Sequence, residues 1–162
     1  MRRSELTDLT LADVESKSAG LLLRLRRSKT DQEGRGQVVG VVHGSHRLTD
    51  PVAALDAWLA LRGREPGPLF TRVFHSRIHH EPLSGNTITR MIHHRAQAAG
   101  LPADRITAHS LRAGHATTAA LAGVPLERIA AQTRHRDLSV LVERYIRPLE
   151  ALATTSSRDL GL

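Results

Sequence analysis

Residues 108–118 read AHSLRAGHATT, and the interpretation of the whole chain starts from them. His109 and Arg112 are three positions apart, so on a helix both side chains lie on one face. Another histidine, His135, follows, and then Tyr145 with arginines on both sides of it. Two histidines, an arginine and a tyrosine beside further arginines make a plausible phosphate-handling site that includes a nucleophile.

The order His-x-x-Arg, then His, then Tyr-x-Arg resembles the catalytic domain of the tyrosine recombinases, the phage integrase family. Residues 1–6, MRRSEL, resemble the segment with the family's first catalytic arginine, which would be Arg2. Residues 26–30, RRSKT, resemble the β-hairpin with its catalytic lysine, which would be Lys29. Residues 83–87, LSGNT, resemble the start of its middle helix. The pieces occur in family order along nearly the whole chain.

Length and composition are those of one globular domain, and the charge favours a polyanionic partner over a surface that is merely basic and soluble. The chain has 162 residues, of which 40% are hydrophobic, enough for one domain with a real core. Aromatic residues are few, so leucine, valine, isoleucine and alanine must build that core. The net charge of +7 favours nucleic acid as the partner, with an anionic membrane surface second.

Several classes of site and location are disfavoured by the composition. The chain has no cysteine, which excludes disulfides, thiolate metal sites and a cysteine nucleophile. We find no apolar run of about 18 residues that could span a membrane. Charged residues open the chain without an apolar run behind them, so no signal peptide is expected. The expected location is the cytoplasm, in association with the nucleoid.

The spacing of the hydrophobic residues predicts a mostly helical fold, and capping residues, glycines and prolines mark the ends of the helices. We expect helices over residues 3–11, from Pro51 to about Gly63, over about 85–99, from Thr107 or His109 to Gly123, from Pro125, and from Asp137 or Ser139 to Pro148. Residues expected to face inward are Leu6, Leu9, Val52, Leu55, Trp58, Leu59, Ile88, Met91, Ile92, Ala96, Leu126, Ile129 and Ala130.

The remaining segments predict strands and loops. Residues 20–26 and 37–42 are strand-like, and the polar stretch 28–36 between them has two glycines, so a basic hairpin or a small three-stranded sheet with Lys29 near its tip is expected. Residues 71–82 are expected to form a loop. The fold class is therefore α+β, mostly helical with one small antiparallel β-sheet near the N-terminus. Residues 1–148 would form a recombinase catalytic domain without its first helix and its upstream DNA-clamping domain, and 149–162 a tail.

The resemblance implies DNA strand cleavage and rejoining, hence site-specific recombination or integration on double-stranded DNA. Tyr145 would attack a backbone phosphate and form a 3′-phosphotyrosyl bond. A phenol is a poor nucleophile at neutral pH, and the reacting phosphate gains charge, so cations and proton carriers are needed. The resemblance implies that Arg2 and Arg112 clamp the phosphate. His109 and His135 would donate hydrogen bonds or move protons, and Lys29 would protonate the leaving oxygen. No metal or cofactor is needed.

Two positions depart from the family pattern. Tyr145 follows His135 by ten residues, one more than the family's usual spacing. One residue rotates a helical side chain by about 100°, so either the loop before the helix absorbs the extra residue or Tyr145 misses the phosphate. Arg134 stands where the family usually has a glycine before its histidine. The adjacent pairs His79–His80 and His93–His94 suggest a metal site, but no carboxylate or cysteine completes one, so a surface position is favoured.

Three functions remain open. The first is an active tyrosine recombinase that self-associates on DNA. The second is a truncated relative that binds DNA and does not cut it. The third is a helix-turn-helix regulator, because Ala122-Gly123-Val124 followed by a short helix resembles that motif. The third leaves Lys29, Arg112 and Tyr145 without a role.

Overall fold

The computed structural model describes residues 1–26, 36–135 and 137–143. The chain divides into two compact units, one formed by residues 2–92 and the other beginning at His93. Lys29 and Tyr145 lie outside the described residues, and so does the second half of the last predicted helix. No described helix is both long enough and apolar enough to span a bilayer.

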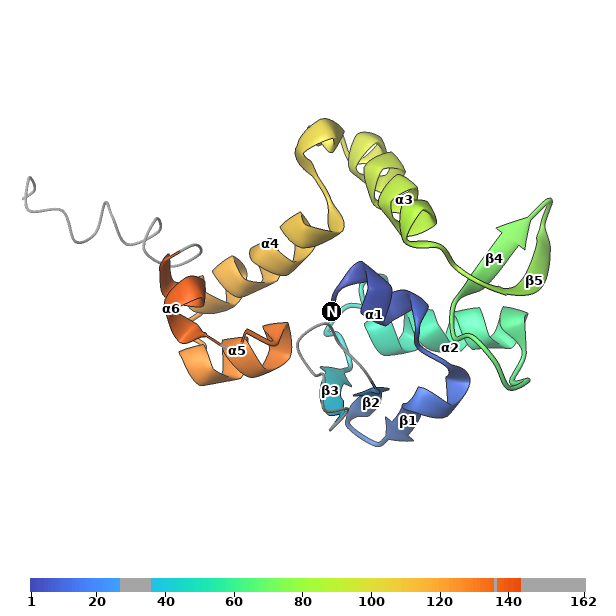
Figure 1. Ribbon diagram of the computed structural model, residues 1–162, viewed down its shortest axis with the longest axis horizontal. Helices are drawn as coiled ribbons and strands as arrows, with labels where there is room; N and C mark the ends of the chain where they lie inside the picture. Colours follow the sequence, from blue (N-terminus) through green and yellow to red (C-terminus); the bar gives the residue numbers. More distant parts are fainter. Residues whose placement is uncertain (27–35, 136, 144–162) are drawn as a thin grey trace, which may run out of the picture. The chain divides into compact units, whose positions relative to one another are not determined.

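The first unit is built on a three-stranded antiparallel sheet with the order β1-β2-β3 (Figure 1). The strands are β1 (Val14–Lys17), β2 (Gly20–Leu25) and β3 (Gln37–Val42). Leu23 lies on the central strand, where it pairs with Val14 of β1 and with Val39 of β3. Alternate residues of a strand face the same side, and accordingly Leu21, Leu23 and Leu25 are all buried. Of the two predicted arrangements, the three-stranded sheet is confirmed.

Helix α2 (Pro51–Arg62) contacts β3 and supplies the helical part of this core. Asp50 caps it, since its Oδ1 accepts a hydrogen bond of 2.8 Å from the backbone N–H of Val52. Val52, Leu55 and Leu59 are buried on one face, at the spacing that the sequence predicted. Trp58 donates its indole N–H to the carbonyl of Leu69 at 2.8 Å and so ties the helix to the segment that follows it.

The N-terminal helix is shorter than predicted. Helix α1 spans Arg3–Thr7, and a 3₁₀ turn, η1, follows at Leu11–Asp13. Between them the chain pairs with a distant segment: the carbonyl of Leu9 accepts from the N–H of Leu69 at 2.8 Å, and the N–H of Leu11 donates to Gly67 at 3.0 Å. The prediction of a helix over 3–11 is therefore wrong beyond Thr7, because long-range pairing holds the backbone extended there.

Residues 71–82 form a hairpin where a loop was predicted. Strand β4 (Thr71–Phe74) pairs antiparallel with β5 (Arg77–Pro82) through a two-residue turn. The turn residues His75 and Ser76 have φ of 47° and 60°, a left-handed conformation that usually calls for glycine or asparagine. The usual turn signal is missing from the sequence, which is why the hairpin could not be predicted from it.

Helix α3 (Gly85–Ala98) runs from the first unit into the second. The Ser84 hydroxyl caps it by accepting from the N–H of Thr87 at 3.1 Å, as the sequence predicted. Ile88 and Ala96 are buried, but Met91 is 54% exposed, so its predicted inward position is wrong. The 3₁₀ turn η2 (Ala103–Arg105) follows, and the C-terminal helices come after it.

The second unit contains α4 (Ala108–Leu121), α5 (Leu126–Thr133) and α6 (Leu138–Leu141). Their core consists of Ala116, Ile129, Ala130 and Leu141, which are between 0% and 7% exposed. Two of these four residues are alanines, so the helices can approach closely. The core holds together the two helices that carry or precede the predicted site residues of this unit.

Leu141→Ala is expected to destabilise the second unit by about 3 kcal/mol, because it leaves a cavity under a side chain that is 0% exposed. Denaturant unfolding followed by circular dichroism measures the loss. The matched control is Leu138→Ala on the same helix: Leu138 is 39% exposed, so its truncation should cost about 0.5 kcal/mol or less. Equal losses for the two variants would contradict this description of the core.

Candidate active site

Helix α4 carries two of the predicted catalytic side chains within one turn. Thr107 caps the helix, because its hydroxyl accepts from the N–H of Ser110 at 3.3 Å, and the helix starts at Ala108. His109 and Arg112 therefore lie in its first turns, three residues apart and on one face. His109 is exposed and Arg112 half-buried. A half-buried guanidinium keeps some of its N–H groups in a fixed direction, as a phosphate clamp requires.

His135 lies just past the end of α5, in the same unit as Arg112. The helix ends at Thr133, and Arg134 takes the left-handed conformation with φ 61° and ψ 46°. The N–H of His135 then donates back to the carbonyl of Ala130 at 3.1 Å. The imidazole is half-buried, and its Nδ1 lies 2.7 Å from the hydroxyl of Thr133. Helix end and hydroxyl together fix the position of the ring.

The backbone at Arg134 is left-handed, which is the conformation that the glycine implied there by the resemblance would adopt. A left-handed residue after the last helical turn closes the helix, and glycine adopts it without steric cost. In this chain Arg134 does so, at a cost of roughly 1 kcal/mol for a residue that has a Cβ atom. Its side chain is only 9% exposed. The departure from the family pattern thus changes the side chain at this position and keeps the helix end.

Arg2 belongs to the first unit, where a buried carboxylate holds it. Glu5 is 4% exposed. Its carboxylate accepts a hydrogen bond of 2.9 Å from Nη1 of Arg2 and one of 2.7 Å from the backbone N–H of Arg2. The side chain of this N-terminal residue is therefore fixed by an ion pair. Glu5 was not among the predicted site residues, although its place three residues after Arg2 at a helix start was a usable signal of this contact.

An open groove lies beside Arg2. Arginine, hydroxyl and amide side chains line it, together with the first residues of α3: Arg2, Arg3, Ser4, Thr7, Ser84, Gly85 and Asn86. Arg3 is held in this region by a hydrogen bond of 2.6 Å from its Nη1 to the hydroxyl of Thr89. Among the described residues that line it, many are hydrogen-bond donors and none is a carboxylate, so the groove suits an anionic group such as a phosphate.

Arg26 anchors the base of the hairpin on which Lys29 is predicted. Its Nε lies 2.5 Å from Oδ1 of Asp13, which is 4% exposed. Burial raises the pKa of Asp13, but hydrogen bonds from the hydroxyl and N–H of Thr10 and from Arg26 outweigh it and hold that pKa below its usual value. Asp13 is thus ionised at neutral pH and keeps the end of β2 in place where the chain leaves the described residues.

Four of the six predicted site residues are among the described residues, and three of these four share one unit. His109, Arg112 and His135 belong to one unit and Arg2 to the other. Lys29 and Tyr145 fall outside the described residues, so the effect of the ten-residue spacing between His135 and Tyr145 stays a prediction.

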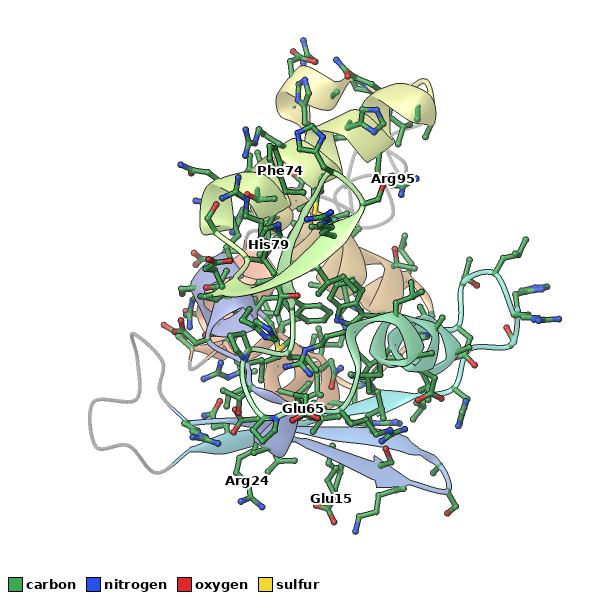
Figure 2. The ribbon with its side chains drawn as sticks, turned by 90° about the vertical axis from the view of Figure 1, so that its right-hand side faces the viewer. Glu15, Arg24, Glu65, Phe74, His79 and Arg95 are labelled. Carbon is green, nitrogen blue, oxygen red and sulfur yellow. The ribbon has the colours of Figure 1, made fainter. Side chains whose placement is uncertain are left out.

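The histidine pairs lie apart from any carboxylate cluster. Among the described residues, no three or more histidines, aspartates or glutamates are grouped so that they could hold a metal ion. His79 lies on the β4–β5 hairpin near Phe74, with ring centroids 6.4 Å apart (Figure 2). His93 lies in α3, and its Nδ1 is 3.1 Å from the carbonyl of Ala103. His80, His93 and His94 are exposed, and His79 is half-buried.

Comparisons with known proteins show the family of the chain and its fold. The model of the phage integrase family matches residues 1–151. The integrase/recombinase xerD homolog of Selenomonas ruminantium is 32% identical over 148 residues, which are 90% of this chain and 42% of that protein. The chain therefore spans about two-fifths of the length of the curated relative it matches.

Solved recombinase structures have the same fold. XerH site-specific recombinase bound to palindromic difH substrate, in a post-cleavage complex, superposes with a TM-score of 0.71 at 18% identity, over 97% of this chain and 42% of that one. XerA recombinase gives 0.66 at 23% identity, over 95% and 52%. A pre-cleavage complex of XerH with difH gives 0.68 at 20% identity, over 95% and 41%. The α+β class predicted from the sequence is confirmed.

Proposed function

Because this chain belongs to the phage integrase family, we propose that residues 1–148 form the catalytic domain of a site-specific DNA recombinase. The observation that carries the proposal is the match of the family model to residues 1–151, a range that includes all the motifs named from the sequence. The same match includes the segment that resembles a helix-turn-helix, so the recombinase is favoured over a regulator of that class.

The proposed reaction is a reversible transesterification. The phenol oxygen of Tyr145 attacks the phosphorus of a DNA backbone phosphate, and its proton passes to one of the two histidines, His109 or His135. The new bond is a 3′-phosphotyrosyl ester, the bond to the 5′ oxygen breaks, and Lys29 gives that oxygen a proton. The reverse reaction, with the 5′ hydroxyl of another strand as the nucleophile, rejoins DNA. One phosphate ester replaces another, so no ATP is consumed.

The roles of the other residues follow from where charge develops. Negative charge grows on the non-bridging oxygens of the phosphate, where preorganised donors lower the barrier. Arg112 and Arg2 would each donate two parallel hydrogen bonds to those oxygens. His109 and His135 would donate hydrogen bonds or carry protons. In support, Arg112 and His109 share one face of α4, and Arg2 is fixed by Glu5 beside a groove rich in donors.

Double-stranded DNA is the proposed partner, and copies of the chain would meet on it. The net charge of +7 agrees with a duplex as ligand. The XerH structures that share this fold are complexes with a DNA substrate. Residues 149–162 would be a tail outside the catalytic domain, and association with the nucleoid would follow from DNA binding.

Covalent capture on DNA tests the proposal. The full chain is incubated with a pool of duplexes of randomised sequence, each with a nick next to the position of attack, so that the cut fragment diffuses away and traps the intermediate. A complex that survives SDS, followed by sequencing of the trapped DNA, is the expected result. A gel shift without any such complex would instead support the second function, a relative that binds DNA and does not cut it.

The salt dependence of the affinity tests whether the protein binds the DNA through its phosphates. Between 50 and 200 mM salt the affinity for a duplex is expected to fall by roughly 100-fold or more, because cationic side chains that bind phosphates release condensed counterions. Fluorescence anisotropy with a labelled duplex measures it, with the same duplex unlabelled as competitor. Affinity that stays constant over this range would contradict a DNA-backbone interface.

A further inference from the structure

Thr133 lies between helix α5 and the imidazole of His135. It is the last residue of α5 and only 2% exposed. Its hydroxyl donates to the carbonyl of Ile129, one turn back in the helix, with 2.6 Å between the two oxygens. The same hydroxyl oxygen is 2.7 Å from Nδ1 of His135. One hydroxyl therefore bridges the helix backbone and the ring of a predicted catalytic residue.

The number of protons decides the direction of the second hydrogen bond. A threonine hydroxyl has one proton and can also accept, whereas a carbonyl oxygen can only accept. If the proton pointed at His135, the lone pairs of two oxygens would face each other at 2.6 Å between Thr133 and Ile129. The proton therefore goes to Ile129, and the hydroxyl oxygen accepts from Nδ1–H of His135.

We propose that Thr133 is a positioning residue that holds His135 in the tautomer protonated at Nδ1, so that Nε2 is the atom through which His135 takes a proton from the attacking phenol or donates a hydrogen bond to the DNA phosphate. Only the role of Nε2 in the reaction on DNA rests on the proposed function; the tautomer of His135 does not. In the neutral ring Nε2 accepts a proton; after a second protonation Nε2 becomes a donor and the ring a cation. The neutral ring can take the proton of the attacking phenol, and the cationic ring can donate a hydrogen bond to a phosphate oxygen; neither state requires the ring to turn.

The surroundings of Thr133 keep this arrangement rigid. Ile129 and Ala130 are 1% and 7% exposed, and both belong to the core of the second unit. The backbone of His135 is fixed separately by its hydrogen bond to Ala130. The ring is thus held from two sides by a packed helix end, and little rotamer entropy remains to be lost when a phosphate arrives.

Nuclear magnetic resonance of the free protein tests the tautomer without any DNA. The chain has ten histidines, and the spectrum of His135→Gln identifies the ¹⁵N ring signals of His135 by their disappearance. We expect protonation at Nδ1 in the wild type and in Thr133→Ser, which keeps a hydroxyl. In Thr133→Val, which keeps the shape, signals of the tautomer protonated at Nε2 should appear. Protonation at Nε2 in the wild type would overturn the proposal, and this spectrum decides even where Thr133→Val does not fold.

The rate of covalent capture tests the consequence for the reaction. Thr133→Val should form the adduct roughly 10-fold more slowly, about the effect of losing one hydrogen bond, and Thr133→Ser should recover most of the rate. Thr118→Val, on the exposed side of α4, is the matched control and should react like the wild type. Equal rates for Thr133→Val and wild type would overturn the positioning role. No adduct with the wild type would refute the proposed function, while the tautomer is still decided by its spectrum.

Discussion

Tyr145→Phe is expected to abolish the covalent protein–DNA adduct completely and to leave the affinity for duplex DNA almost unchanged. Phenylalanine keeps the ring and removes the oxygen that would attack phosphorus. No other tyrosine is present in the chain to replace it, so the loss should be total. Radiolabelled nicked DNA on an SDS gel measures the adduct, and anisotropy at fixed salt measures the affinity.

The variant also separates the two main functions. If the wild type forms the adduct and Tyr145→Phe does not, the chain is a recombinase with Tyr145 as its nucleophile. An adduct that persists in Tyr145→Phe would mean that another side chain attacks, and the assignment of Tyr145 would be wrong. Equal melting temperatures of the two proteins are the control for folding, since the ring itself is retained.

Arg112→Ala is expected to slow adduct formation by about 100- to 1000-fold, the usual effect of removing one preorganised donor to developing negative charge. Arg112→Lys keeps the charge but loses the planar fork with its two parallel hydrogen bonds, so it should recover only a small part of the rate. Single-turnover measurement of the adduct at saturating protein separates this effect from weaker DNA binding.

The control for Arg112 is another arginine of the same unit. Arg128 lies on α5 and is exposed, so Arg128→Ala lowers the net charge of the protein by the same amount as Arg112→Ala. Its adduct rate should stay close to that of the wild type. If both alanine variants slowed the reaction alike, the effect of Arg112 would be one of overall charge, and its role as a phosphate clamp would be contradicted.

Most helices of this fold could be predicted because their signals are local. Asp50 and Pro51 mark the start of α2, and Ser84 marks that of α3; each cap involves residues only two or three positions apart. The face shared by His109 and Arg112 likewise follows from the helical repeat alone. The order of the motifs along the chain was enough for the family, which the comparisons confirm.

Features that depend on distant residues could not be predicted in the same way. The extended backbone at Leu9 requires the segment around Leu69, more than fifty positions later, to pair with it. The β4–β5 hairpin forms although its turn residues His75 and Ser76 lack the preference for a left-handed conformation. In both places pairing between segments of the chain outweighs local propensity. Patterns in a single sequence indicate local propensity and do not show such pairing.

By itself, the sequence determined which chemical groups this protein has, in which order, and on which helix faces, because those depend on spacing along the chain. Only the tertiary structure decided how the groups are held. The ion pair between Arg2 and buried Glu5 and the hydrogen bond between Thr133 and His135 depend on burial and on angstrom-scale distances. The hydroxyl of Thr133 donates its one proton to the helix backbone, so it can only accept from His135. A sequence does not show which hydrogen bonds a hydroxyl makes.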